Sequence, residues 1–175
     1  PGLPLLAQKG EAAIPEGANP RQIIDYLTAY PPNTAQGALR LIDAYEATGA
    51  KGDAAAQAVI TWRELSLSAT EAQTLIDRYG DTVTDHSTAR MQRSLWARNY
   101  DEALRVAPLL PDGWEKLIAA IKAVAEDENG MSKAINAVPN ALGGMPVLSY
   151  ERFIWRAKNN GADDAVTWML QHSTS

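Results

Sequence analysis

The sequence predicts an all-α fold, built as an α-solenoid or superhelix of helical hairpins. Signals that start and end helices follow one another almost without a gap from residue 20 onward. The valines are scattered and do not alternate with polar residues, so the period of two that marks strands is missing. A degenerate helix-turn-helix repeat also recurs, as expected for hairpins that bury their apolar faces by stacking.

The composition is that of a folded protein with an acidic balance. With 175 residues, 46% of them hydrophobic, the chain can bury a continuous core. Its 16 Lys and Arg against 21 Asp and Glu give a net charge of -5, which argues against nucleic-acid binding. The lack of Cys excludes disulfides, thiolate metal sites and thiol nucleophiles. No apolar run approaches the roughly 20 residues of a membrane span.

Two regions are expected along the chain. Residues 1–19 mix Pro, Gly and Ala without an apolar period, which indicates an irregular lead-in. Residues 20–175 form the predicted α-superhelical domain. Because the chain begins at Pro1 without Met or an apolar signal segment, we expect a processed chain or a fragment of a longer protein.

The first two helices of this domain have clear boundary signals. Asn19 is placed to cap a helix with Pro20 in its first position, and that helix is expected to end near Tyr30. Thr34 is placed to cap a second helix, with Gly49 as its terminator.

A third helix is expected to open at Asp53, and the fourth begins with a capping box. In that box the Ser68 side chain accepts from the backbone N–H of Glu71, whose carboxylate accepts from the Ser68 backbone. The fourth helix is expected to end at Gly80. Further helix starts are predicted at Asp85, Asp101, Asp112, Ser132, Ser149 and Asp163. The connections are short, as between antiparallel helical neighbours.

The repeat joins a helix that carries a large apolar residue to a second helix that starts with an acidic residue and Ala. The two clearest copies join residues 93–96 to 101–104 and residues 152–155 to 163–166, and looser copies occupy 39–54 and 117–135. The small Ala lets two helices approach closely, while Trp96 or Trp155 is expected to fill the groove between them.

Five tryptophans could form a sugar-binding platform, because aromatic faces stack on the apolar faces of sugar rings. Four of them lie on apolar stripes of predicted helices, which favours packing in the core: Trp62, Trp96, Trp155 and Trp168. Only Trp114, which follows a Pro-Asp-Gly turn near a helix start, is expected to be exposed.

The polar residues that could carry chemistry are few. Residues 126–128 form an acidic run, Glu-Asp-Glu, that could supply a catalytic carboxylate, but their place at a helix end favours a solvated face. His86 and His172 each precede a Ser, yet sequence neighbours do not form a catalytic triad; a first-turn helix residue and a frayed end are expected. We therefore assign no catalytic, cofactor-binding or metal-ligating residue.

A series of short motifs resembles the superhelical, non-catalytic region of soluble lytic murein transglycosylases, and the weight lies in their order and spacing from residue 26 to 170. In order they are Tyr30-Pro31, residues 37–41, Ala44-Tyr45 with Gly49, Trp62-Arg63, Leu67-Ser68, Glu71-Ala72, Leu75, Arg78, Gly80, Asp85-His86, Arg90, and residues 95–97, 103–105, 109–111, 137–139, 150–152, 155 and 164–166.

This resemblance implies a periplasmic, or outer-membrane-associated, enzyme that cleaves the bond between N-acetylmuramic acid and N-acetylglucosamine in peptidoglycan to leave 1,6-anhydro ends. In such enzymes the catalytic Glu opens a Glu-Ser motif in a lysozyme-like domain, with a Gly-Leu-Met-Gln motif downstream. Neither motif occurs in this chain. The resemblance therefore implies a non-catalytic scaffold that helps to position glycan strands or partner proteins.

Two other functions remain open from the sequence. The chain could be a stand-alone helical-repeat adaptor, similar to tetratricopeptide (TPR) solenoids, that binds a protein partner in a concave groove. It could also be a complete hydrolase, which would require Glu126 or Glu128 to be buried in a pocket.

Overall fold

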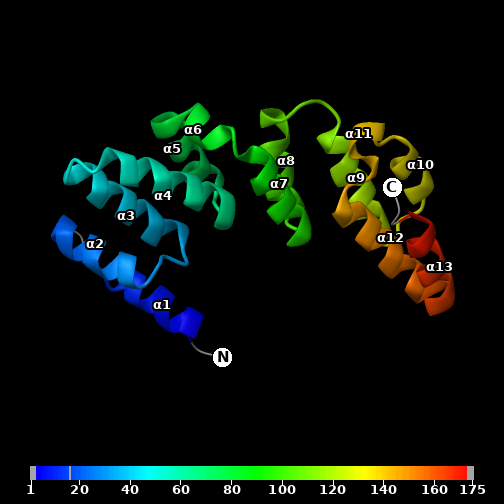
Figure 1. The fold of residues 1–175 in the computed structure, drawn as a ribbon, viewed down its shortest axis with the longest axis horizontal. Coiled ribbons are helices and arrows are strands. Elements are labelled where there is room, and N and C mark those ends of the chain that lie inside the picture. Colours follow the sequence, from blue (N-terminus) through cyan, green and yellow to red (C-terminus); the bar gives the residue numbers. More distant parts are fainter. Residues whose placement is uncertain (1–2, 16, 173–175) are drawn as a thin grey trace. The chain divides into compact units, whose positions relative to one another are not determined.

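The computed structural model describes residues 3–15 and 17–172, and all of the regular structure in these ranges is helical (Figure 1). They contain thirteen α-helices, one short 3-10 helix and no strand, which confirms the predicted all-α class. The chain divides into two compact units, residues 1–90 and 91–175, and the division falls within helix α7 (Ser87–Trp96). None of the described helices has both the length and the apolar character needed to cross a bilayer.

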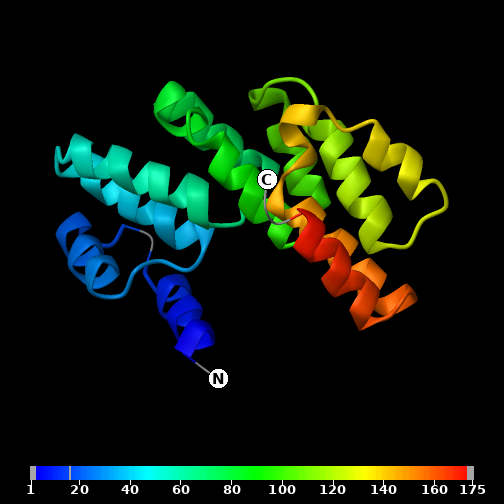
Figure 2. The same cartoon turned by 45° about the vertical axis from the view of Figure 1, so that its right-hand side comes forward.

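The first unit is a series of helices in which neighbours in sequence pack against each other. Its helices are α1 (Leu3–Ala12), α2 (Pro20–Ala29), α3 (Ala35–Ala47), α4 (Lys51–Glu64), α5 (Ala69–Tyr79) and α6 (Asp81–Thr84). Helix α3 packs on α1, α2 and α4, and α4 packs on α5 and α6 (Figures 1 and 2). The buried apolar cluster between them consists of Ala35, Ile42, Ala54, Ala58, Trp62, Leu67, Leu75 and Val83.

The helix boundaries of this unit follow the predicted caps closely. Asn19 Oδ1 accepts from the backbone of Arg21 at 2.9 Å, and Thr34 Oγ1 accepts from that of Gly37 at 3.0 Å. Both bonds of the Ser68–Glu71 capping box are present, at 2.8 and 3.2 Å. These side chains satisfy backbone donors that have no partner within their own helix. Helix α4 begins two residues before the predicted Asp53.

The lead-in prediction was wrong, because residues 3–12 form helix α1. Glu11, only 4% exposed, accepts from the backbone N–H groups of Asn33 at 2.7 Å and Thr34 at 3.0 Å, and from the Thr34 hydroxyl. Arg40 donates to the carbonyls of Glu11 and Ile14 at 3.1 and 2.6 Å. Helix α1 is therefore held by hydrogen bonds to α3 and to the residues just before α3. An analysis of apolar periodicity does not detect such bonds.

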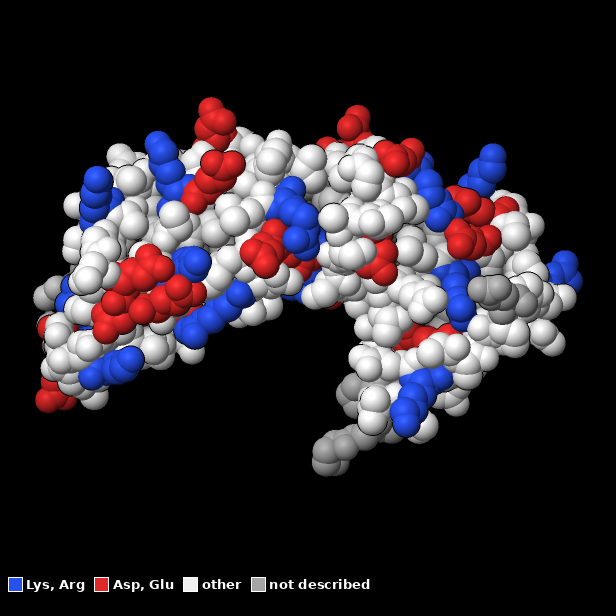
Figure 3. Space-filling model, turned by 180° about the vertical axis from the view of Figure 1, so that it is seen from behind, with Lys and Arg blue, Asp and Glu red and all other residues white. Residues whose placement is uncertain are grey.

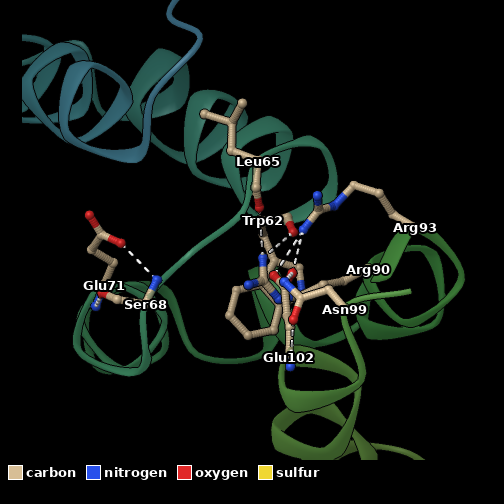
Figure 4. Close-up of polar contacts among 8 residues, drawn as sticks. All are labelled: Trp62, Leu65, Ser68, Glu71, Arg90, Arg93, Asn99 and Glu102. Carbon is tan, nitrogen blue, oxygen red and sulfur yellow. Dashed lines mark hydrogen bonds and ion pairs between the residues drawn. The ribbon is translucent and has the colours of Figure 1, made fainter. Parts of the chain in front are cut away.

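The end of α4 is held by a buried arginine. Arg90, 1% exposed, donates from Nη1 to the carbonyl oxygens of Trp62 at 2.7 Å and Leu65 at 3.3 Å (Figure 4). Its guanidinium carbon lies 4.6 Å from the centroid of the Trp62 ring. Carbonyls at the last turn of a helix lack partners within that helix, so Arg90 satisfies acceptors that would otherwise be buried and unbonded.

The second unit is organised around a single buried helix. It continues from α7 with α8 (Tyr100–Val106), the 3-10 helix Ala107–Leu109, α9 (Trp114–Ala125), α10 (Met131–Asn136), α11 (Asn140–Gly143), α12 (Pro146–Asn159) and α13 (Ala162–His172). Helix α9 packs on α8, α10, α11 and α12, and α12 packs on α13 (Figure 2). Most α9 positions are buried, as expected of a helix with neighbours on several sides.

The core of the second unit is larger than that of the first. Its buried members are Met91, Leu95, Ala103, Val106, Ala107, Trp114, Leu117, Ile118, Ala120, Ile121, Val124, Val138, Val147 and Leu148. Helix starts lie within one to three residues of the predicted ones; α12 begins at Pro146, three residues before Ser149, because proline is well accepted in the first helical turn. Near Asp85 the prediction was less accurate, since the short helix α6 precedes a turn and α7 starts at Ser87.

In three of the four places where the sequence predicted a repeat, the two helices pack on each other: α3 on α4, α9 on α10 and α12 on α13. Gly49 and Gly130 have φ of 80° and 94° between α3 and α4 and before α10, a backbone region that glycine occupies without strain. The Ala of the acidic-Ala start is at most 1% exposed in three copies: Ala54, Ala103 and Ala165. A small side chain at these positions permits the close helix contacts that the repeat requires.

Replacing Arg90 by Met tests the role of the buried guanidinium. We expect Arg90→Met to lower the free energy of unfolding by about 2 to 4 kcal/mol, because a buried and a partly buried carbonyl lose their donor. Urea unfolding followed by circular dichroism measures the loss. Arg63→Ala, an exposed arginine on α4, is the matched control and should change stability by less than about 0.5 kcal/mol. Equal effects of the two substitutions would contradict the role given to Arg90.

The attachment of α1 is tested at Glu11. In Glu11→Ala we expect the amides of α1 to exchange with deuterium much faster than in the native chain, because the segment loses three hydrogen bonds at once. Hydrogen exchange read by mass spectrometry provides the comparison, and the amides of α4 serve as the internal control. Unchanged protection of α1 would show that other contacts hold it.

Candidate binding surface

Three of the five tryptophans lie in the core as predicted. Trp62 is 1% exposed, Trp168 is 8% exposed, and Trp155 is partly buried against the core of the second unit. Trp96 does not follow the prediction, since it is 52% exposed and does not fill the groove of its repeat. Met91 and Leu95 already occupy the buried stripe of α7, and one further residue along a helix turns the side chain by about 100°.

The prediction for Trp114 was also wrong, because this residue was expected to be exposed and is buried. It is 6% exposed and belongs to the core cluster of the second unit. Gly113, with φ of 110°, turns the chain so that α9 begins at Trp114 with its indole directed inward. A position beside a turn therefore did not imply exposure, because the turn itself packs against Pro139 and Leu142.

The acidic run at residues 126–128 is exposed in full. Lys122 lies 4.0 Å from Glu126, a weak surface pair one helical turn apart. Asp127 accepts a hydrogen bond from the indole Nε1 of Trp155 at 2.6 Å, so one carboxylate of the run positions a core side chain. Glu126 and Glu128 are exposed to solvent and do not lie in the apolar pocket that a catalytic acid requires.

Neither imidazole is hydrogen-bonded to a serine within residues 3–15 and 17–172. His86 is partly buried and lies in the turn before α7, one residue earlier than the predicted first-turn position. His172 is the last residue of α13; its ring stacks on Trp168 with centroids 4.6 Å apart, and its Nδ1 lies 2.8 Å from the Trp168 carbonyl. A carbonyl only accepts, so Nδ1 donates this hydrogen bond. Ser173 lies outside the described residues.

The exposed Trp96 forms a pair with Tyr150 of α12. Their ring centroids are 5.4 Å apart with an interplanar angle of 56°, and Tyr150 is 46% exposed. Tilted pairs at this distance are a favourable aromatic geometry, so each ring helps to hold the other in place. Two large aromatic faces are thereby presented to solvent side by side.

An ion pair between an exposed arginine and a buried carboxylate holds the chain beside this aromatic pair. Arg98, which has φ of 53°, donates from Nε and Nη2 to the two carboxylate oxygens of Glu151 at 2.9 and 2.7 Å. Glu151 is 3% exposed, and its hydrogen bonds are the main cause that raises the pKa of Arg98. The pair joins Arg98, two residues after Trp96, to Glu151, the residue after Tyr150. It therefore helps to fix the two rings relative to each other.

An apolar groove of about 340 Å³ adjoins Tyr150. It is lined by Ser149, Tyr150, Phe153, Trp168, Met169 and His172. We call Trp96, Tyr150 and these groove residues the aromatic surface. Its polar groups lie at the edges: the Tyr150 hydroxyl, the Ser149 hydroxyl and His172.

The electrostatic character of the chain is mixed. On the face drawn in Figure 3, acidic and basic side chains are interspersed without an extended basic stripe. No group of three or more His, Asp or Glu side chains among the described residues is placed to hold a metal ion. The groove beside Tyr150 is lined mainly by aromatic and apolar side chains, which suits stacking on the apolar face of a ligand.

The chain matches no protein-family model, no curated protein and no solved structure.

Replacing Arg98 tests how the aromatic pair is held. In Arg98→Ala we expect a loss of about 1 kcal/mol, because the buried Glu151 carboxylate loses two donors that water at the exposed Arg98 position replaces only in part. Denaturant unfolding followed by tryptophan fluorescence measures it, with Lys158→Ala on exposed α12 surface as the control. A loss no larger than that of the control would show that the ion pair does not hold this surface.

Proposed function

We propose that this chain is a non-catalytic superhelical scaffold domain of a soluble lytic transglycosylase, and that its aromatic surface helps to position peptidoglycan glycan strands. The parent enzyme of this proposal is periplasmic or outer-membrane-associated and cleaves bonds between N-acetylmuramic acid and N-acetylglucosamine to 1,6-anhydro products. The observation that carries the glycan part is the exposed, tilted pair of Trp96 and Tyr150.

Sugar rings suit this surface for a physical reason. The axial C–H groups of a pyranose form apolar patches that stack on aromatic faces, while its hydroxyls need hydrogen-bond partners at the edge. The Trp96–Tyr150 pair offers two such faces, and Tyr150 continues into the groove with Phe153 and Trp168. The Ser149 hydroxyl and the His172 imidazole supply polar partners. A net charge of -5 leaves stacking and hydrogen bonding, rather than charge, as the source of affinity.

The scaffold part of the proposal is supported by the way the helices pack. In the first unit most helices contact the next one in sequence, and in the second unit α9 contacts α8 and α10 while α12 contacts α13; several of the connections are only a few residues long. The three buried alanines, Ala54, Ala103 and Ala165, occupy equivalent places in the repeat. In this proposal the hairpins stack as a TPR-like α-solenoid, in which each hairpin buries a face that it cannot bury alone.

The non-catalytic part is supported by the position of the carboxylates. Glycosidic cleavage needs a carboxylic acid held in an apolar pocket so that it is protonated at neutral pH. Glu126 and Glu128, the sequence candidates for that role, are exposed. In this proposal the acid belongs to a lysozyme-like domain of the parent enzyme.

A second candidate, a TPR-like adaptor that binds a protein partner, is favoured by one observation. Helix α13 exposes large apolar side chains: Val166 at 44%, Met169 at 43% and Leu170 at 63%. An exposed apolar helix face is typical of protein interaction surfaces. The glycan and protein ligands are separated by the binding experiment below.

The glycan proposal is tested by co-sedimentation with purified peptidoglycan. We expect the native chain to sediment with the glycan, and Trp96→Ala and Tyr150→Ala each to weaken binding about fivefold or more, since a lost aromatic stack is worth about 1 kcal/mol. Leu104→Ala removes a similarly exposed apolar side chain of the same unit and is the matched control. Binding that is equally strong in all variants, or absent from the native chain, would refute the glycan role and leave the adaptor as the better candidate.

The same incubation tests the absence of catalysis. We expect no soluble muropeptides with 1,6-anhydro ends by mass spectrometry when the chain acts alone. If such products are found and Glu126→Gln or Glu128→Gln abolishes them, the scaffold proposal is wrong and the chain is itself a catalyst.

A further inference from the structure

A second cavity in the residue 91–175 unit differs from the aromatic surface because arginines line it. It has a volume of about 200 Å³ and lies where α10 and α12 meet the end of α9. Met131 and Ile135 of α10 form an apolar wall, and Ser132 and Asn136 add neutral polar side chains. Helix α12 contributes Arg152, Trp155 and Arg156, which are discussed next.

The two carboxylates near this cavity both have hydrogen-bond partners. Arg156 donates to Asp164 at 3.1 Å, and Asp164 also accepts from Asn160 at 3.2 Å. The other nearby carboxylate, Asp127, accepts from the indole of Trp155. Both carboxylates are therefore already hydrogen-bonded.

Within residues 3–15 and 17–172, Arg152 has no carboxylate partner. Its guanidinium carbon lies over an aromatic ring, 4.7 Å from the centroid of Trp168. Burial, and then the charge of Arg156, lower the pKa of Arg152. An arginine remains charged at neutral pH even so, and a partly desolvated cation gains when an anion reaches it.

The other copy of the repeat shows what such an arginine does when it has a partner. Arg93 donates to both oxygens of Glu102 at 2.8 and 2.9 Å (Figure 4). Arg152 occupies the position of Arg93 in the second copy, and Asp164 that of Glu102.

In the second copy a different arginine pairs with the acidic residue. The segment between its Trp and its acidic residues is about one helical turn longer, so Arg156, one turn after Arg152, reaches Asp164 instead. Arg152 is left facing the cavity, where the first copy has a closed internal ion pair.

We infer that this cavity binds a small ligand with a single carboxylate on a short apolar group, such as the C-terminal alanine of a peptide, with Arg152 as the residue that takes the carboxylate. The planar guanidinium presents a fork of N–H donors that matches a planar carboxylate. Ser132 and Asn136 supply neutral partners, and Met131 and Ile135 contact the apolar group. This site does not depend on the proposed glycan function, because its lining shares no residue with the aromatic surface, which Arg152 meets through the Trp168 ring.

A carboxylate suits the cavity better than a phosphate does. Only one guanidinium is unengaged by a carboxylate, so a phosphate dianion would keep about one uncompensated charge. Asp164 and Asp127 lie close by and would repel the second negative charge. The size of the cavity also limits the ligand to a few heavy atoms beyond the carboxylate.

The inference is tested by titration with N-acetyl-alanine, followed by the indole N–H resonance of Trp155 in NMR spectra. We expect a saturable shift with a dissociation constant on the order of 1 mM, as for a ligand of this size. N-acetyl-alanine amide, which lacks the charge, should cause no saturable shift. This acid-against-amide comparison uses the native chain and does not depend on the folding of any variant.

Two variants of α12 complete the test. Arg152→Met should weaken N-acetyl-alanine binding about tenfold or more, because the charge-assisted bonds are lost. Lys158→Met makes the same change of charge on the exposed side of α12 and should bind as the native chain does. Equal binding of acid and amide, full binding by Arg152→Met, or a response to inorganic phosphate but not to N-acetyl-alanine would each overturn the assignment.

Discussion

This fold depends on hydrogen-bond partners for the backbone groups at buried helix ends, and the buried guanidinium of Arg90 supplies them at the end of α4. The longest described helices have 14 residues, and helices of this length are marginal in water on their own. Their stability comes from packing, and packing buries helix ends whose backbone groups have no partner within the helix. Arg90 satisfies two carbonyls at the end of α4, while Glu11 serves the backbone before and at the start of α3. Long polar side chains thus allow short helices to pack closely at both ends.

The predictable parts of the fold are those decided within a few residues. The caps at Asn19, Thr34 and Ser68 were predicted because donor and acceptor lie two or three residues apart. Helix α1 and the role of Arg90 were not predicted, since their hydrogen bonds join residues more than 20 positions apart. Local signals define where helices begin, but they do not show which polar side chains will be buried between helices.

The candidate binding surface was less predictable for a geometric reason. Trp96 and Leu95 are neighbours in sequence, and only the fold decides which of the two faces the core. Tyr150 was noted only as part of a motif, and its contact with Trp96 joins two helices that are distant in the chain. The cavity at Arg152 had a detectable signal, because the longer connection in the second repeat already separates Arg152 from its acidic counterpart.

The attachment of α1 is sensitive to the size of the side chain at position 37, where the chain has Gly37. Helix α3 brings the Gly37 backbone so close to the Glu11 carboxylate that even a single methyl group there would overlap Oε2. Alanine is otherwise the better helix former at such a position, so local helix preference and long-range attachment make opposite demands on this residue. A substitution that strengthens α3 by itself would displace the Glu11 carboxylate and leave α1 held by the bonds that Arg40 donates to the Glu11 and Ile14 carbonyls. How firmly the first helix is attached thus depends on one absent methyl group, 26 residues along the chain from the carboxylate that it would displace.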